Sequence, residues 1–317
     1  MFEKIKRNIN HPEKIIIKLG KISRLIPDKL YLQAYYYNVF EKKLDLKCPK
    51  TFNEKLQWLK LYDRQPEYTM MVDKYMVREY VAKQIGAEYL IPLLGVWNDP
   101  DDIDFESLPN QFVLKCNHNS AVGMCICKDK SKLDINKVKE GLRKGLTQDY
   151  YLSGREWPYK DVTRKIICEK YMTDSKSTDV SDYKIQKDCS FTADKEELRD
   201  YKFFCFNGKV KCFKIDFDRF VNHKANYFSR SKELLPFGEC ECPPDYSRKL
   251  KLPDKLDEMI FLAEKLAYNH QFLRVDFYDV NGKIYFGELT FFPASGFGPF
   301  YPEEWDLTLG ETVRKLG

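Results

Sequence analysis

The segment from Arg274 to Gly296, RVDFYDVNGKIYFGELTFFPASG, constrains the fold of this chain more than any other. Apolar and polar residues alternate on both sides of Asn281-Gly282, a pair typical of tight hairpin turns. Charges nevertheless interrupt both arms, at Arg274, Asp276 and Glu288. An ionised carboxylate inside an apolar sheet is costly unless a cation meets it. The segment therefore predicts a half-buried hairpin that carries a functional cluster of charges.

The register of this hairpin decides whether its two carboxylates lie together. Side chains alternate along a strand, so Arg274 and Asp276 share a face. A two-residue turn at Asn281-Gly282 would send Glu288 to the opposite face. A three-residue loop, with Gly282 in a left-handed conformation, would place Arg274 opposite Glu288. The sequence DVNGK favours the three-residue loop, which predicts that all three charges share one face.

Two carboxylates on one face are suited to a divalent cation. Mg²⁺ prefers hard oxygen ligands and normally binds one or two carboxylates together with substrate phosphates. Thr290 offers a further oxygen, and the Pro/Gly-rich stretch FFPASGFG follows it as a loop, where functional groups gather. The alternative is a structural ion pair between Arg274 and Glu288, with Asp276 at an exposed edge.

The composition predicts a folded, cytoplasmic protein. The chain has 317 residues, and 43% of them are hydrophobic, enough to build a packed core. It contains no apolar run of about 18 residues, so no transmembrane helix is expected. The N-terminus has neither a signal-peptide core nor a cleavage site. The ten cysteines include no CxxC pair and lie mostly in apolar runs, so reduced thiols are expected.

Positive charge is concentrated at the N-terminus. Residues 1–60 carry 14 Lys and Arg against 6 Asp and Glu, whereas the whole chain has a net charge of +5. One explanation is a solvated helix face, and the other is peripheral contact with an anionic membrane surface. No basic-aromatic motif accompanies the charge, so nucleic acid is not an expected partner.

The order of the elements favours an α+β fold. Helices are predicted early in the chain, followed by strands and antiparallel hairpins mixed with helices, which argues against a doubly wound parallel sheet. A polar segment, Asp174 to Leu198, interrupts the pattern as an insertion. The predicted helices lie within residues 1–65 (with Phe52 to Tyr62 capped by Asn53) and over 73–86, 134–148 and 254–270. The predicted strands are 90–97, 111–116, 123–128, 165–172 and a hairpin around Asn207-Gly208.

Lys115 is a candidate phosphate ligand. It lies in QFVLKC, and a buried lysine needs an anion or loses its proton. The polar loop from Asn117 to Gly123 follows directly, although GxxxxGK[ST] is absent and the loop is not a P-loop. The alternative is an edge-strand lysine that reaches water. Lys74 could supply a second cation, unless it lies on a solvated helix face.

The order of these elements resembles the ATP-grasp family, and more narrowly its TupA-like group, named for teichuronopeptide biosynthesis. The resemblance runs from about Pro49 onward and is carried by TFNEKLQWLKLYDR, VDKYMVREYV, IPLLGVW, LPNQFVLKCNH, DYKFFCFNGK and the opening hairpin. It implies two α+β lobes that clasp ATP, with a helical N-terminal extension. The implied regions are a basic helical region (1–72), an N-terminal lobe segment (73–110), a small lobe or lid (111–172) and a large C-terminal lobe with the metal site (173–317).

The resemblance also implies roles for individual residues. The residues expected to bind ATP are Lys74, Lys115 and Ser120 at the phosphates, Glu169, Lys170, Tyr171 and Met172 at the adenine, and Asp174 at the ribose. The residues expected to bind Mg²⁺ are Asp276, Glu288 and Thr290. Arg274 would steady an acyl phosphate. Lys202, with Lys214, His223 and Lys224, could contact the carboxylate substrate.

The activity implied by the resemblance is an ATP-dependent ligase that joins a small-molecule or glycan carboxylate to an amine in capsular or surface-polysaccharide biosynthesis. Two alternatives remain open. One is a glycosyltransferase, for which the acidic stretch from Asp99 to Asp104 offers a DxD-like site without a Rossmann glycine signature. The other is a non-catalytic ATP-binding scaffold, because His118-Asn119-Ser120-Ala121 stands where the group often has HGSG and lacks both glycines.

Overall fold

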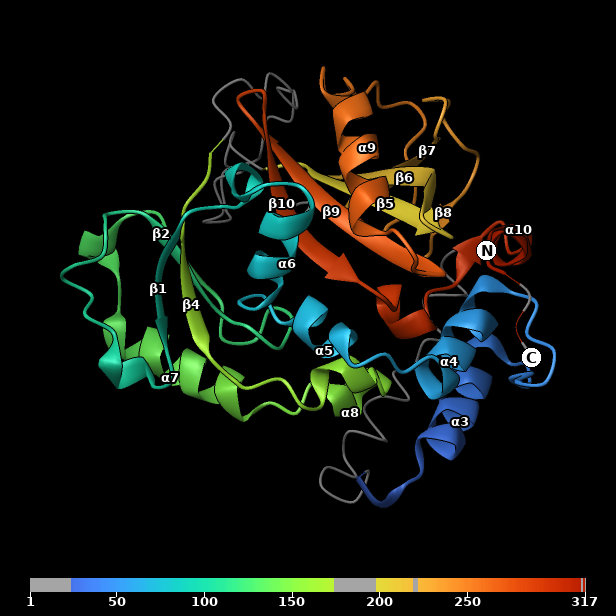
Figure 1. Cartoon of the computed structure of the whole chain (residues 1–317), viewed down its shortest axis with the longest axis horizontal. Coiled ribbons are helices and arrows are strands. Elements are labelled where there is room, and N and C mark those ends of the chain that lie inside the picture. The colour runs from blue at the N-terminus through green and yellow to red at the C-terminus, as the bar shows by residue number, and fades with distance from the viewer. Residues whose placement is uncertain (1–23, 174–197, 219–221, 315, 317) are drawn as a thin grey trace.

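The computed structural model describes residues 24–173, 198–218, 222–314 and 316, and it is built around two antiparallel sheets (Figure 1). The smaller sheet has the strand order β1-β4-β2-β3. Its strands are β1 (Leu93–Trp97), β2 (Phe112–Cys116), β3 (Cys125–Cys127) and β4 (Ile166–Lys170). Helix α7 (Ile135–Thr147) packs against this sheet.

Side chains alternate along β2, so one face of the smaller sheet is buried in a core and the other is only half-buried. Phe112 and Leu114 are buried in a core that also holds Leu142 of α7. Val113 and Lys115 alternate with them and are only half-buried, so they lie on the opposite face. Strand β2 lies between β4 and β3, so the alternative of Lys115 on an edge strand is wrong.

The larger sheet has the strand order β10-β9-β5-β6-β7. Its strands are β5 (Asp200–Phe206), β6 (Lys209–Phe217), β7 (Lys224–Ser229), β9 (Phe272–Val280) and β10 (Lys283–Thr290). Helix α9 (Leu256–Leu266) covers one face, where Cys205 Sγ lies 3.8 Å from the carbonyl oxygen of Ala263. Asp200 and Lys202 lie in alternation with Tyr201 and Phe203, so they belong to the face away from α9.

The remaining helices surround these sheets (Figure 1). They are α3 (Asp28–Phe40), α4 (Phe52–Tyr62), α5 (Glu67–Val72), α6 (Val77–Gln84), α8 (Tyr151–Gly154) and α10 (Glu304–Thr312), and a short pair, β8 (Gly238–Glu239) with β11 (Phe300–Tyr301), completes the fold. The predicted N-cap of α4 is wrong: Thr51 caps the helix in a capping box with Glu54. Asn53 instead binds the carboxylate of Asp306 on α10.

The predicted turn of the charged hairpin is also wrong, although the predicted shared face is confirmed. Asn281 and Gly282 form a two-residue turn, both with positive φ, and Lys283 pairs with Val280. The register then shifts by one residue at Gly287, so Glu288 lies opposite Asp276. This β-bulge restores the shared face that a regular two-residue hairpin would have lost.

Most other elements lie close to their predicted positions. The helices predicted over 134–148 and 254–270 and the hairpin around Asn207-Gly208 are confirmed, with small shifts at their ends. The nine cysteines among the described residues are all free. Within the same residues, no helix combines the length and apolar character needed to cross a bilayer.

Candidate functional site

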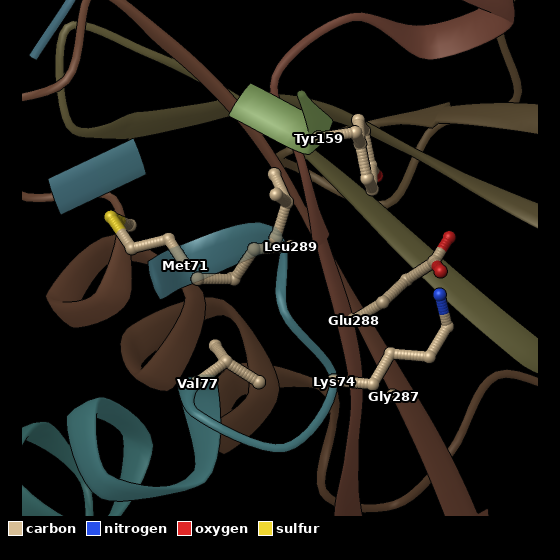
Figure 2. A pocket seen from close by; sticks show the side chains of 8 residues that line it. Met71, Lys74, Val77, Tyr159, Gly287, Glu288 and Leu289 are labelled. Atoms are coloured by element: carbon tan, nitrogen blue, oxygen red, sulfur yellow. The ribbon is translucent and has the colours of Figure 1, made fainter. Parts of the chain in front are cut away.

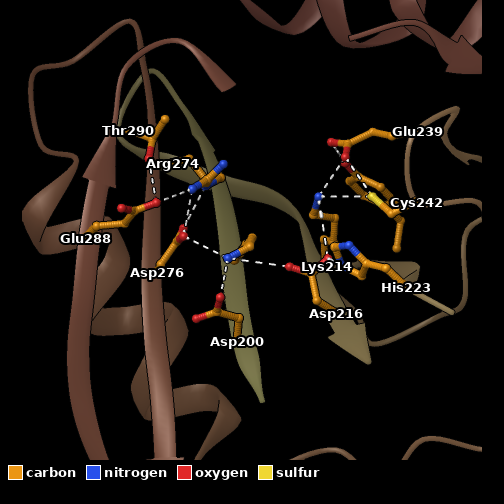
Figure 3. Close-up of polar contacts among 12 residues, drawn as sticks. Asp200, Lys214, Asp216, His223, Glu239, Cys242, Arg274, Asp276, Glu288 and Thr290 are labelled. Atoms are coloured by element: carbon orange, nitrogen blue, oxygen red, sulfur yellow. Dashed lines mark hydrogen bonds and ion pairs between the residues drawn. The ribbon is translucent and has the colours of Figure 1, made fainter. Parts of the chain in front are cut away.

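The predicted metal ligands lie on the face of the larger sheet away from α9, because Asp276 pairs with Lys202 and Glu288 pairs with Asp276. Figure 3 shows their side chains close together. The Arg274 guanidinium donates to both carboxylate oxygens of Asp276 at 2.7 Å and to Glu288 Oε1 at 2.7 Å. Thr290 Oγ1 lies 3.4 Å from the same Glu288 oxygen. Asp276 is 1% exposed and belongs to an inner strand, so the alternative that placed it at an exposed edge is wrong. The predicted Arg274–Glu288 pair does form.

Lys202 extends this cluster across the sheet. Its ammonium lies 3.1 Å from Asp276 Oδ2, 2.6 Å from Asp200 Oδ2 and 3.4 Å from Asp216 Oδ2. Burial lowers the pKa of Lys202, but Asp276 and Asp200 outweigh it, so this pKa is raised. Lys202 therefore lies among carboxylates of its own chain, and contact with a substrate carboxylate remains a prediction.

The oxygen donors of this cluster fit a divalent cation. Lys214 continues the row with contacts to Glu239 at 2.7 Å and Asp216 at 3.7 Å. Together, five carboxylates (Asp200, Asp216, Glu239, Asp276, Glu288) meet three cations (Lys202, Lys214, Arg274). Lys74, which points toward Glu288, is a fourth cation, so one negative charge is left in excess. The oxygens of Asp276, Glu288 and Thr290 are the hard donors that Mg²⁺ prefers.

The two carboxylates predicted to bind the metal, Asp276 and Glu288, differ in their electrostatics. Burial raises the pKa of Asp276, although Arg274 and Lys202 act against it. For Glu288, burial also acts to raise the pKa, but Arg274, Lys74 and Lys202 prevail and lower it. Glu288 therefore stays ionised, and its side chain is 44% exposed, so a ligand can reach it.

Lys74 approaches this face from the segment before α6. Figure 2 shows its ammonium pointing toward the carboxylate of Glu288, at a small cavity that Tyr159 and Gly287 also line. Lys74 Nζ donates to the carbonyl oxygen of Asn119 at 2.6 Å. Burial is the main cause that lowers the pKa of Lys74. The structure thus brings together Lys74, the polar loop and Glu288, one of the predicted metal ligands.

The loop from Asn117 to Gly123 is fastened at its base. Asn117 donates to Asp73 Oδ1 at 2.8 Å, and Asn119 donates to Gln148 Oε1 at 3.0 Å. Ser120 is exposed at the tip. Ala121 has a φ of +64°, a conformation that favours glycine. The backbone at Ala121 therefore suits glycine, the residue that the related HGSG motif has at this position, but in this chain alanine adopts the conformation.

Lys115 is held by Glu169 rather than directed at open solvent. Its ammonium lies 2.6 Å from Glu169 Oε2, and Arg78 lies 3.3 Å from Glu169 Oε1. Glu169, predicted at the adenine, thus links two cations. It lies on the same face of the smaller sheet as Lys115, opposite the face that packs on α7. A bound phosphate would compete with Glu169 for Lys115.

The predicted adenine hinge follows at the end of β4. Lys170 is exposed, and its amide donates to the carbonyl oxygen of Pro92 at 2.9 Å. Tyr171 and Met172 are half-buried as the chain leaves the sheet. Asp174 and most of the polar 174–198 segment lie outside the described residues, and so does most of the basic arm, residues 1–23.

Sequence reasoning missed the residues that orient the predicted ligands. Asp73 and Asn117 fasten the loop, while Asp200 and Asp216 hold Lys202. Strand alternation could have identified Asp200 as a neighbour of Lys202. The contact of Asp216 depends on the β5–β6 register, which contains an irregularity between Phe204 and Cys205.

The acidic stretch considered for a glycosyltransferase lies far along the chain from these groups. Asp99 caps a short 3-10 turn, Pro100–Asp102. Asp101 forms ion pairs with Lys139 and Arg143 of α7. Nothing in this arrangement favours a nucleotide-sugar site there.

A family model described as TupA-like ATPgrasp matches residues 54–193 and 185–314. A search of curated proteins finds no match.

Several solved structures show a distant likeness. D-alanine–D-alanine ligase from Helicobacter pylori is 13% identical, with a TM-score of 0.39, and the match covers 83% of this chain and 69% of that chain. Phosphoribosylamine–glycine ligase from Thermotoga maritima is 11% identical, with a TM-score of 0.40 and coverage of 71% and 48%. The ATP-grasp ligase PsnB, in complex with a minimal precursor, Mg and ADP, is 10% identical, with a TM-score of 0.38 and coverage of 75% and 57%.

These TM-scores are low, so the assignment depends on the family match. That match runs from residue 54 to residue 314, most of the chain. The chain therefore belongs to the TupA-like ATP-grasp family, and its fold and enzyme class are those of ATP-dependent ligases.

Proposed function

We propose that this protein joins a carboxylate to an amine, using ATP and Mg²⁺, and that it proceeds through an acyl phosphate. The observation that carries the proposal is the charged face of the larger sheet. Asp276 and Glu288 meet there at Arg274, beside Lys74. That arrangement is suited to phosphoryl transfer, in which cations stabilise charge on the transferred group.

Each residue has a role in this proposal. Asp276, Glu288 and Thr290 would hold Mg²⁺, and Lys74, Lys115 and the loop around Ser120 would hold the phosphates. ATP and Mg²⁺, when bound, supply the activated phosphoryl group and neutralise its charge. The guanidinium of Arg274 donates to both metal carboxylates and can also orient an anionic substrate group next to them.

We further propose that the substrate carboxylate belongs to a sugar or an amino acid used in capsular or surface-polysaccharide biosynthesis. The family match supports this context through the TupA-like group. A cytoplasmic reaction fits the free cysteines of the described residues. The basic N-terminal residues are the proposed contact with an anionic membrane surface.

A thermal-shift screen of ATP, ADP and sugar nucleotides, each with and without Mg²⁺, tests the nucleotide assignment, since a ligand stabilises the state that binds it. ATP with Mg²⁺ should raise Tm by several degrees, and sugar nucleotides should not. Product analysis with a panel of amino acids and uronic acids then tests the reaction. ADP, phosphate and an amide are expected. A sugar-nucleotide shift with release of a nucleoside diphosphate would indicate a glycosyltransferase, and binding of ATP without turnover would indicate a scaffold.

A further inference from the structure

A pair of tyrosines lies next to the proposed metal site. Tyr150 and Tyr159 belong to the segment between α7 and β4, and their ring centroids lie 4.8 Å apart with the ring planes at 72°. Tyr159 lines the small cavity that Lys74 and Glu288 also line, and Figure 2 shows its ring on the same side of the cavity as the carboxylate of Glu288. The pair therefore borders the place proposed for the reaction.

The segment that carries the pair is fastened to the part of the chain that follows β10. Ser295 Oγ donates to Glu156 at 2.6 Å. Trp157 stacks on Tyr68, with 5.9 Å between ring centroids, and Tyr68 stacks in turn on Phe291, the first residue after β10, at 4.0 Å. These contacts hold the tyrosines in place relative to the predicted metal ligands, as a binding site requires.

Both tyrosine hydroxyls are available to a ligand. Within the part of the chain that the structure describes, neither hydroxyl has a hydrogen-bond partner, and both residues are only half-buried. Burial raises the pKa of both phenols; Glu156 and Glu288 act in the same direction, and Arg274 acts against them. Each phenol therefore stays neutral, and its hydroxyl can both donate and accept a hydrogen bond.

The carboxylate on the same segment, Glu156, is already engaged. It accepts the hydrogen bond from Ser295, and the charge of Lys60 acts on it against the effect of burial. Glu288 is itself a predicted Mg²⁺ ligand. The two tyrosines thus offer neutral hydroxyls to a substrate, rather than a free negative charge that would meet the α-ammonium group of an amino acid.

We propose that Tyr150 and Tyr159 form one wall of the subsite for the carboxylate substrate, and that this substrate is a sugar acid. The inference deepens the proposed function and rests on it. Arg274 would meet the carboxylate, while the tyrosine hydroxyls bond to hydroxyls of the sugar. A tyrosine also places an apolar ring beside a polar tip, which suits a sugar ring that carries C–H groups and hydroxyls side by side.

Direct binding tests this inference without turnover. The full-length protein is titrated by calorimetry, in the presence of Mg²⁺ and ADP, with D-glucuronate, D-galacturonate, L-glutamate and L-alanine. A uronate should bind, and the two amino acids should not. Tyr159→Phe removes one oxygen and keeps the ring, so it should raise the Kd of the uronate about 3- to 10-fold, the effect of one lost hydrogen bond. Tyr150→Phe combined with Tyr159→Phe should raise it further, while the Kd of ADP with Mg²⁺ stays the same.

Tyr268→Phe is the matched control, because it removes the same oxygen from a side chain that is 71% exposed, and it should change neither Kd. Unchanged uronate binding in the double variant would overturn the subsite, and so would an equal loss of uronate and ADP binding, which would indicate damage to the fold. Binding of the amino acids in place of the uronates, with ADP formed from ATP, would overturn the sugar acid and retain the proposed function. A uronate that binds through the tyrosines but never gives ADP from ATP would support the subsite and overturn the proposed ligase reaction.

Discussion

At the scale of single residues, the two carboxylates proposed to bind Mg²⁺ make unequal contributions to stability. Asp276 is buried and holds both Arg274 and Lys202, so Asp276→Asn removes the partner of two buried cations. Such losses cost about 3–5 kcal/mol. Glu288 is 44% exposed, so Glu288→Gln should change the free energy of unfolding by less than about 1 kcal/mol.

Glu288→Gln is therefore the cleaner probe of metal-dependent activity. We expect it to abolish Mg²⁺-dependent ADP formation while urea unfolding remains close to that of the unaltered protein. The assay follows ADP release across a Mg²⁺ titration. Exposed Glu304→Gln, on α10, serves as the control for a lost surface carboxylate. Full turnover in Glu288→Gln would remove Glu288 from the metal site.

Substitution of Ala121 tests whether alanine, in place of glycine, strains the backbone of the polar loop. Its φ of +64° destabilises the folded state by roughly 1–2 kcal/mol when the residue is alanine. Glycine would remove this strain, but it would also raise the entropy of the unfolded chain, which offsets part of the gain. Ala121→Gly should therefore stabilise the protein slightly, by about 0.5 kcal/mol in urea unfolding. The control is Ala82→Gly inside helix α6, which should destabilise by about 1 kcal/mol. A matching loss at both positions would contradict strain at Ala121.

At the scale of elements, helix α7 supports the polar loop through one close approach. A Cβ added at Gly145 would lie 2.7 Å from Cys116 Sγ and 2.9 Å from the carbonyl oxygen of Val122. A Cβ at Gly141, one turn earlier, would meet nothing within 4 Å. Of these two helix glycines, only Gly145 lies where the loop approaches α7 closely.

The same substitution should have opposite effects at these two glycines. Gly141→Ala should stabilise by about 0.5–1 kcal/mol, because alanine is the better helix former. Gly145→Ala should destabilise and weaken the Tm shift caused by ATP with Mg²⁺, because the loop must move away from the helix. Both follow from thermal unfolding with and without nucleotide. Stabilisation by both substitutions would show that the loop does not depend on this contact.

The limits of sequence reasoning also appear at this scale. The helix over Ile135–Thr147 and the Asn207-Gly208 hairpin follow from local periodicity and turn chemistry, and both are confirmed. The shared face of Asp276 and Glu288 was correctly predicted for a wrong reason, because a bulge at Gly287 is a property of the paired strands. The partnership of Lys115 and Glu169 requires the β2–β4 pairing between distant segments, which local patterns do not specify.

At the scale of the whole molecule, one buried lysine joins three parts of the chain. Lys60 of α4 donates to the carbonyl oxygens of Gly154 in α8, at 2.7 Å, and of Ser295, at 2.6 Å, in the loop after β10. Ser295 Oγ donates in turn to Glu156. Burial lowers the pKa of Lys60 to about 7 and raises that of Glu156. The N-terminal helices are thereby connected to the loop that follows β10, the strand that carries Glu288.

This connection should make stability depend on pH with a definite sign. Between about pH 7 and the ordinary lysine pKa of 10.5, the unfolded chain keeps the Lys60 proton that the folded protein has released. The unfolded state then binds more protons, so Lys60 makes the free energy of unfolding rise with pH over this range, by up to about 1.4 kcal/mol per unit. Lys60→Met removes that rise. Without the ammonium, Glu156 retains its proton to higher pH in the folded variant, which lowers the variant's free energy of unfolding further as the pH rises.

Urea unfolding from pH 7 to 9 should therefore show a growing advantage of the unaltered protein over Lys60→Met, whereas the exposed control Lys132→Met should follow the unaltered protein. Parallel curves for the unaltered protein and Lys60→Met would mean that Lys60 stays charged in the folded state.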